Sequence, residues 1–76
     1  MNTKHKTNKL IKNIKLITNN KDIDESSTQE NTLGWDSLAY MSIVAMVEKE
    51  FEVEISFNNI KKFNSIKSIL TIINNV

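Results

Sequence analysis

The sequence LGWDSL, residues 33–38, holds the only Gly and the only Trp of the 76-residue chain. It lies where a long polar segment gives way to the most apolar stretch. Gly34 allows the backbone to turn with a positive φ. Asp36 or Ser37 can cap a following helix, because a short side-chain oxygen accepts a hydrogen bond from a free N–H of the first turn. The stretch therefore predicts a helix that starts near Ser37, with an exposed hydroxyl at an end that favours negative charge.

The segment from Ser37 to about Phe51 is the strongest helix candidate, and its apolar residues fall on two faces. The first face is predicted to be core and contains Tyr40, Ile43, Val44, Val47 and Phe51. The second contains Leu38, Met41 and Ala45, with Glu48 further along. A short chain cannot bury such a helix on all sides, so the second face is predicted to bind partners. Scattered surface apolar residues are the alternative explanation.

Two further segments have helical apolar spacing. Residues 3–18 carry one apolar stripe, with Lys side chains away from it: Leu10, Ile11, Ile14 and Ile17. This pattern predicts a core-facing helix, and a basic helix on an anionic membrane is the alternative. A last helix is predicted after a Ser65 cap, with apolar residues at helical spacing: Ile66, Ile69, Leu70 and Ile73.

The remaining segments connect these helices. Residues 19–32 are polar apart from Ile23, which predicts a long loop. Residues 50–57 alternate polar and apolar, but no second segment could pair with them as a strand. We predict an extended connector there, with Val53 and Ile55 inward and Glu52 and Glu54 in water. Residues 57–63 predict a short helix with Ser56 as its cap.

The predicted fold class is therefore all-α, a small bundle of three main helices plus one short helix, with a long loop after the first. Residues 1–76 are predicted to form a single domain. The residues expected in the core are Ile43, Val47, Phe51, Ile55 and Ile69.

Composition narrows the chemistry. The chain has no Cys, so any thiol must be brought in. No apolar run approaches the ~20 residues of a membrane span, and a cytoplasmic monomer is expected. Asp22, Asp24 and Glu25 lack the spacing of a calcium loop, so no metal site is predicted. Ser37 is outside the Gly-x-Ser-x-Gly motif, and His5 has no sequence neighbour that would make a catalytic site, so hydrolysis is not predicted.

Charge is strongly segregated. Residues 1–21 hold six Lys and no acid, whereas residues 22–54 hold nine acids and one Lys. A nucleic-acid binder using the N-terminal Lys residues stays a possible class. The absence of Arg argues against it, because Arg is favoured in base-edge and bidentate phosphate recognition.

The order Gly34-x-Asp36-Ser37-Leu38, followed by an apolar helix, residues 51–55 (FEVEI) and a last apolar repeat, resembles the acyl carrier protein family. The resemblance runs from about Leu33 to Ile73. It implies that Ser37 bears 4′-phosphopantetheine, with Gly34, Asp36 and Leu38 as supporting motif residues. It also implies that a phosphopantetheinyl transferase (a holo-carrier synthase) moves this group from coenzyme A onto Ser37, with Mg²⁺ at the transferase site.

By the same resemblance, the chain is expected to be a stand-alone acyl carrier and not an enzyme, with acyl groups held as thioesters on the arm. Partners would include an acyl-loading ligase, a ketosynthase or an acyltransferase, with no nucleic acid and no membrane span. An aminoacyl or peptidyl carrier and an unmodified helical adaptor stay open as alternatives.

The chain departs from the family pattern in charge. Ala39 and Ser42 stand where the early second helix is often acidic, and the first helix is unusually basic. We therefore expect partner contacts at Leu38, Met41, Ala45 and Glu48, in a pathway specialised for one kind of acyl group.

Overall fold

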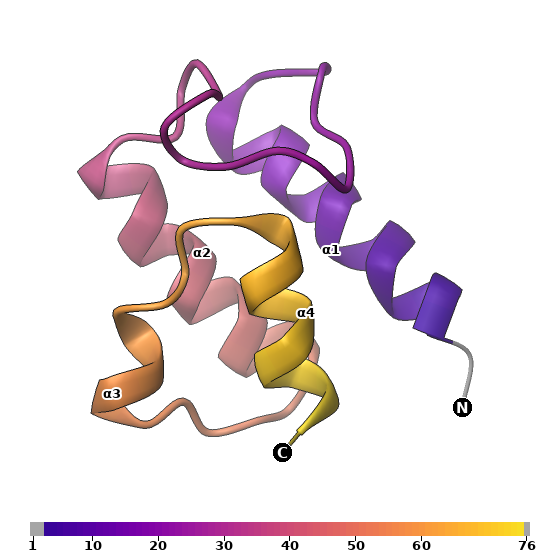
Figure 1. Ribbon diagram of the computed structural model, residues 1–76, viewed down its shortest axis with the longest axis vertical. Helices are drawn as coiled ribbons and strands as arrows, with labels where there is room; N and C mark the ends of the chain where they lie inside the picture. The colour runs from indigo at the N-terminus through magenta and orange to yellow at the C-terminus, as the bar shows by residue number, and fades with distance from the viewer. Residues whose placement is uncertain (1–2, 76) are drawn as a thin grey trace.

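The computed structural model describes residues 3–75, which form four helices joined by loops. The helices are α1 (Thr3–Thr18), α2 (Ser37–Glu50), α3 (Phe57–Ile60) and α4 (Ile66–Asn74). α1 packs against α2 and α4, and the long loop runs between α1 and α2 (Figure 1). This part of the chain contains no β-strand, only an isolated antiparallel bridge between Thr28 and Ser65. The predicted all-α fold is confirmed.

α1 ends at the predicted residue, and its end has a local cause. Asn19 takes a left-handed conformation with φ of 53°. Its N–H donates to the Leu16 carbonyl at 3.4 Å, and the Asn20 N–H donates to the Lys15 carbonyl at 3.1 Å. This pair of bonds is the Schellman motif, in which Asn is an accepted substitute for Gly. The helix therefore terminates and turns the chain into the loop.

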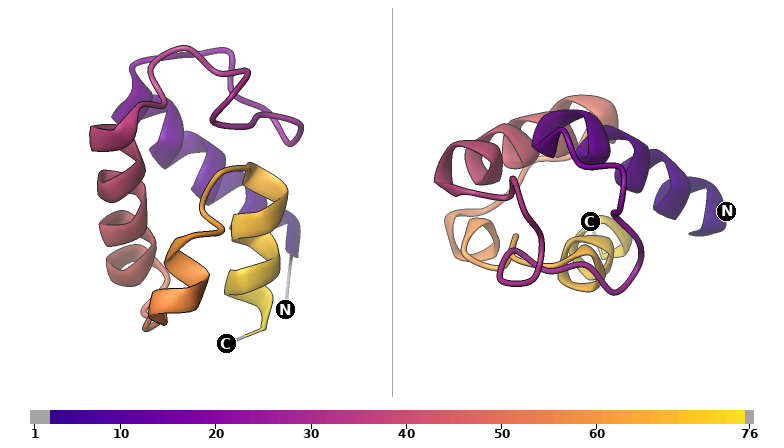
Figure 2. Two further views of the ribbon diagram at one scale, coloured as in Figure 1. Left: turned by 60° about the vertical axis from the view of Figure 1, so that its left-hand side comes forward. Right: turned by 90° about the horizontal axis from the view of Figure 1, so that it is seen from above.

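The long loop crosses the end of the bundle where α4 begins (Figure 2). The Gln29 N–H donates to the Asn64 carbonyl at 2.8 Å, and the Ile66 N–H donates to the Ser27 carbonyl at 3.1 Å. Ile23, the apolar residue of the predicted loop, is buried. These bonds and this anchor hold the loop although it has no helix or strand of its own.

The core draws on α1, α2 and α4, on the segments on either side of α3, and on Ile23 and Trp35 from the long loop. Four of the five predicted core residues are buried: Ile43, Val47, Ile55 and Ile69. The prediction for Phe51 was wrong, because this side chain is only partly buried at the C-terminal end of α2. Phe63 is fully buried instead.

The position of Phe51 at the rim of the core brings it near a charge. The Lys9 ammonium lies 5.3 Å from the centre of the Phe51 ring, and 3.8 Å from the Glu50 carboxylate. The Lys9 ammonium also donates to the Glu50 carbonyl at 2.9 Å. α1 is thereby tied to the last turn of α2. Tyr40, from the same predicted stripe, is also only partly buried.

The predicted extended connector is correct only in its second half. Glu50 still belongs to α2, and Phe51 and Glu52 form a turn in which Glu52 has φ of 52°. The Val53 N–H donates to the Glu48 carbonyl at 3.3 Å, which closes the helix end. Glu52 is exposed and Val53 partly buried, as predicted.

Local caps explain where the last two helices start. The Ser56 hydroxyl accepts from the Asn59 N–H at 3.3 Å, and the Ser65 hydroxyl accepts from the Ser68 N–H at 3.0 Å. Both predicted caps are confirmed. The predicted short helix was too long, since α3 ends at Ile60 and turns before Phe63.

Candidate functional site

Ser37 is the first residue of α2, and its side chain is exposed. The cap is Asp36 and not Ser37: the Asp36 carboxylate accepts from the Ala39 N–H at 2.8 Å. The Tyr40 N–H donates to the Asp36 carbonyl at 2.8 Å, which opens the helical ladder. Within residues 3–75, no side chain or backbone group hydrogen-bonds the Ser37 hydroxyl. This hydroxyl is therefore presented to solvent from a rigid helix start.

Gly34 sets the approach to this helix. Its φ is 92°, the left-handed conformation that the sequence allowed for. A Cβ atom at Gly34 would overlap the carbonyl oxygen of Thr18, and would lie 3.2 Å from its carbonyl carbon and 3.3 Å from its Cβ. Only Gly therefore satisfies both the backbone angle and the contact with the end of α1. The segment before α2 therefore lies directly against the end of α1.

Trp35 is a structural anchor that the sequence interpretation missed. It is 3% exposed and belongs to the main core cluster. It immediately precedes the Asp36 cap, while Tyr40 is the fourth residue of α2, which is the spacing of a hydrophobic staple. That spacing could have identified it. Within residues 3–75 its indole N–H has no hydrogen-bond partner.

The predicted partner-binding face of α2 is indeed exposed. We call it the α2 surface, defined by Leu38, Met41, Ala45 and Glu48. Leu38 is 80% exposed and Met41 56%, high values for apolar side chains of this size. The Glu48 carboxylate, however, accepts from the Ile55 N–H at 3.2 Å. This carboxylate is therefore shared between the surface and the segment after α2.

Ala39 does not belong to that surface. It is 5% exposed and faces the core, so a charged residue there would need burial without a partner. Of the two positions that were noted as departures from an acidic helix, only Ser42 is exposed. The hydroxyl of Ser42 leaves that exposed position uncharged.

In the long loop, the Asp24 carboxylate is hydrogen-bonded by a neighbouring residue. The Asp24 carboxylate accepts from the hydroxyl of Ser26 at 2.6 Å and from its N–H at 2.8 Å. These bonds favour the charged form and hold the pKa of Asp24 below its ordinary value. Residues 3–75 contain no group of three or more His, Cys, Asp or Glu side chains that could hold a metal ion. No helix within this range has the length and hydrophobicity needed to span a bilayer.

The described residues form a small helical fold in which the exposed Ser37 hydroxyl lies at a helix start capped by Asp36. The family model described as phosphopantetheine attachment site matches residues 9–73, so the chain belongs to this family of carrier proteins. Members carry covalently attached 4′-phosphopantetheine and interact with phosphopantetheinyl transferase and biosynthetic enzymes. Searches of curated proteins and of solved structures gave no match.

Proposed function

We propose that Ser37 is the attachment site of 4′-phosphopantetheine, and that the chain carries acyl groups as thioesters on this arm. The exposed, unbonded Ser37 hydroxyl at the first residue of α2 supports the proposal most directly. The free N–H groups and the dipole at this helix end favour a phosphodiester. The chain has no Cys, so the thiol must come from the arm.

The chain's own residues act by presentation. During modification the Ser37 oxygen forms the new bond to phosphorus and the pyrophosphate bond of coenzyme A breaks. The 3′-phosphoadenosine 5′-phosphate half leaves, and the hydroxyl proton passes to a base of the transferase. Asp36 acts as the helix cap, since its carboxylate accepts from the Ala39 N–H and holds the first turn. When attached, the arm supplies a thiol that forms thioesters.

Intact mass tests the attachment. The chain is incubated with coenzyme A, Mg²⁺ and a phosphopantetheinyl transferase, and we expect one addition of the mass of phosphopantetheine. Ser37→Ala should abolish the addition and leave the circular dichroism spectrum unchanged. Ser42→Ala is the matched control, since Ser42 is an exposed serine of the same helix and should leave the addition intact. Continued modification of Ser37→Ala would refute the site.

The α2 surface supports a dedicated carrier for a specialised acyl group. Asp36 is its nearest acid, and both Asp36 and Glu48 already accept backbone hydrogen bonds. Enzymes that bind a strongly acidic helix would meet few carboxylates here, because Ala39 is buried and Ser42 is uncharged. We expect slow chain elongation by ordinary fatty acid synthesis enzymes when this chain replaces an acidic carrier. Elongation at matching rates would contradict specialisation, while leaving Ser37 attachment untouched.

A further inference from the structure

The outward side of α1 and the turn after it are rich in Lys. Lys9 forms an ion pair with Glu50. Within residues 3–75, Lys12, Lys15 and Lys21 form no ion pair and no side-chain hydrogen bond. Packing of this fold therefore does not account for these three charges.

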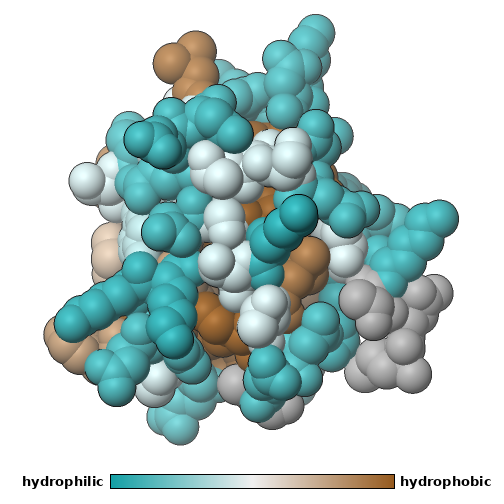
Figure 3. Space-filling model, viewed as in Figure 1, coloured by the Kyte–Doolittle hydropathy of each residue, from teal (hydrophilic) through white to brown (hydrophobic). Residues whose placement is uncertain are grey.

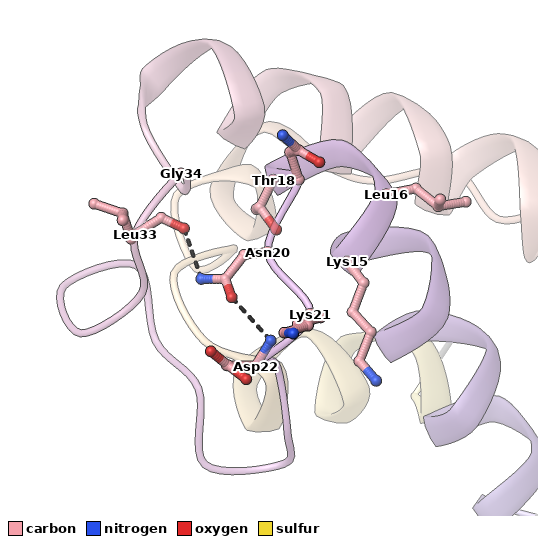
Figure 4. A pocket seen from close by; sticks show the side chains of 9 residues that line it. Lys15, Leu16, Thr18, Asn20, Lys21, Asp22, Leu33 and Gly34 are labelled. Atoms are coloured by element: carbon pink, nitrogen blue, oxygen red, sulfur yellow. Dashed lines mark hydrogen bonds between the residues drawn. The ribbon is translucent and has the colours of Figure 1, made fainter.

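Two apolar side chains stand beside these charges. Leu16 is 73% exposed and Leu33 is 88% exposed. Both line an open depression of about 720 Å³ together with Lys15, Lys21 and Gly34. In Figure 4, Leu33 lies on one side of this depression and Lys15 and Leu16 on the other. Asp22 is the single carboxylate among the lining residues.

The floor of the depression is held in place. The Asn20 side chain donates to the Leu33 carbonyl at 2.8 Å and accepts from the Asp22 N–H at 2.8 Å (Figure 4). These bonds join the end of α1 to the segment that leads into α2. The residues that line the depression therefore also connect α1 to the segment that leads to Ser37, three residues after Gly34.

We propose that Lys12, Lys15, Leu16, Lys21 and Leu33, here called the α1 surface, dock a protein partner that presents carboxylates around an apolar side chain. Charge complementarity selects an acidic partner, and the two exposed leucines supply the apolar contact. Leu16 also lines a groove with Ala45, so the α1 surface is continuous with the α2 surface. A partner docked there would lie beside the helix that begins with Ser37.

An anionic membrane fits the α1 surface less well. Helices that lie on a bilayer insert a broad apolar face. In α1 that face is turned inward, since Leu10 and Ile14 are fully buried. The face seen in Figure 3 is mainly hydrophilic, with hydrophobic groups at its edges and between the polar side chains near its centre.

The test uses the full chain and two synthetic helical peptides with the same leucines. One peptide carries Glu at its polar positions, and the other carries Lys. We expect the Glu peptide to shift amide resonances at Leu16, Lys21 and Leu33, and the Lys peptide to shift none. Leu16→Ser should raise Kd about tenfold at every salt concentration, and Lys15→Glu combined with Lys21→Glu should do so mainly at low salt.

Matched controls remove non-specific effects. Phe57→Ser alters an equally exposed apolar side chain on α3, and Lys67→Glu reverses an exposed charge on α4. Neither should change Kd. Equal binding of both peptides, or resonance shifts confined to the α2 surface, would overturn the proposal. So would shifts produced by anionic phosphatidylglycerol vesicles but not by the Glu peptide, or shifts that follow self-association.

This inference can be separated from the proposed attachment. Ser37→Ala should bind the Glu peptide like the parent chain, because the α1 surface does not include Ser37. The α1-surface variants should still gain phosphopantetheine mass, which also reports that they are folded. If the parent chain gains phosphopantetheine mass normally but does not bind the Glu peptide, only the proposal for the α1 surface fails.

Discussion

The Tyr40 hydroxyl accepts a hydrogen bond from the Phe63 N–H at 3.1 Å and donates one to the Ile60 carbonyl. One side chain of α2 thereby satisfies two backbone groups at the end of α3. Because Tyr40 is one turn after Ser37, this link joins the helix that presents the hydroxyl to the second half of the chain.

Tyr40→Phe should destabilise the chain by about 1 kcal/mol, because the two hydrogen bonds of the hydroxyl are lost while the Phe63 N–H keeps its longer bond to the Ile60 carbonyl at 3.3 Å. Denaturant unfolding measures the change. Attachment at Ser37 should persist, since the Asp36 cap is unaffected. An unchanged free energy of unfolding would mean that water replaces the hydroxyl without loss.

Gly34→Ala should disturb both stability and the approach to α2. The positive φ alone costs about 1–3 kcal/mol for a non-Gly residue, and the overlap with the Thr18 carbonyl adds to it. Thermal unfolding measures the first effect, and the rate of phosphopantetheine mass gain measures the second. Leu33→Ala, at an exposed neighbour, is the control and should unfold like the parent.

Phe63→Ala and Phe51→Ala should differ although they remove the same ring. Phe63 is fully buried, so its truncation should cost about 3–5 kcal/mol. Phe51 is only partly buried, and its loss should cost roughly 1–2 kcal/mol, including its contact with Lys9. Chemical unfolding of both variants gives the comparison. An equal or larger cost at Phe51 would contradict the observed packing.

Substitutions on the α2 surface should distinguish apolar from charged contacts with the transferase. Met41→Ser should raise KM for modification at all salt concentrations, since a buried apolar contact sets dissociation. Removing the charge of Glu48 should slow association mainly at low salt. Glu48→Gln is preferable to Glu48→Lys, because the amide oxygen can still accept from the Ile55 N–H. A strong Glu48→Gln effect at high salt would indicate a structural role instead.

Local chemistry made much of the fold predictable. Caps act within one turn, so Ser56 and Ser65 could be recognised as helix starts from neighbouring residues alone. The requirement for Gly34 was also visible as the single Gly before an Asp-Ser helix start. Apolar spacing likewise located the outward α2 surface, because helical periodicity is a property of the segment itself.

Tertiary packing decided the rest. Phe51 and Phe63 have the same side chain, and only the folded arrangement leaves Phe51 at the rim of the core and Phe63 fully buried. Glu48 resembled a free surface charge until folding brought the Ile55 N–H to it. In each case the deciding neighbour is brought into place by the folded backbone, and composition and periodicity do not specify such contacts.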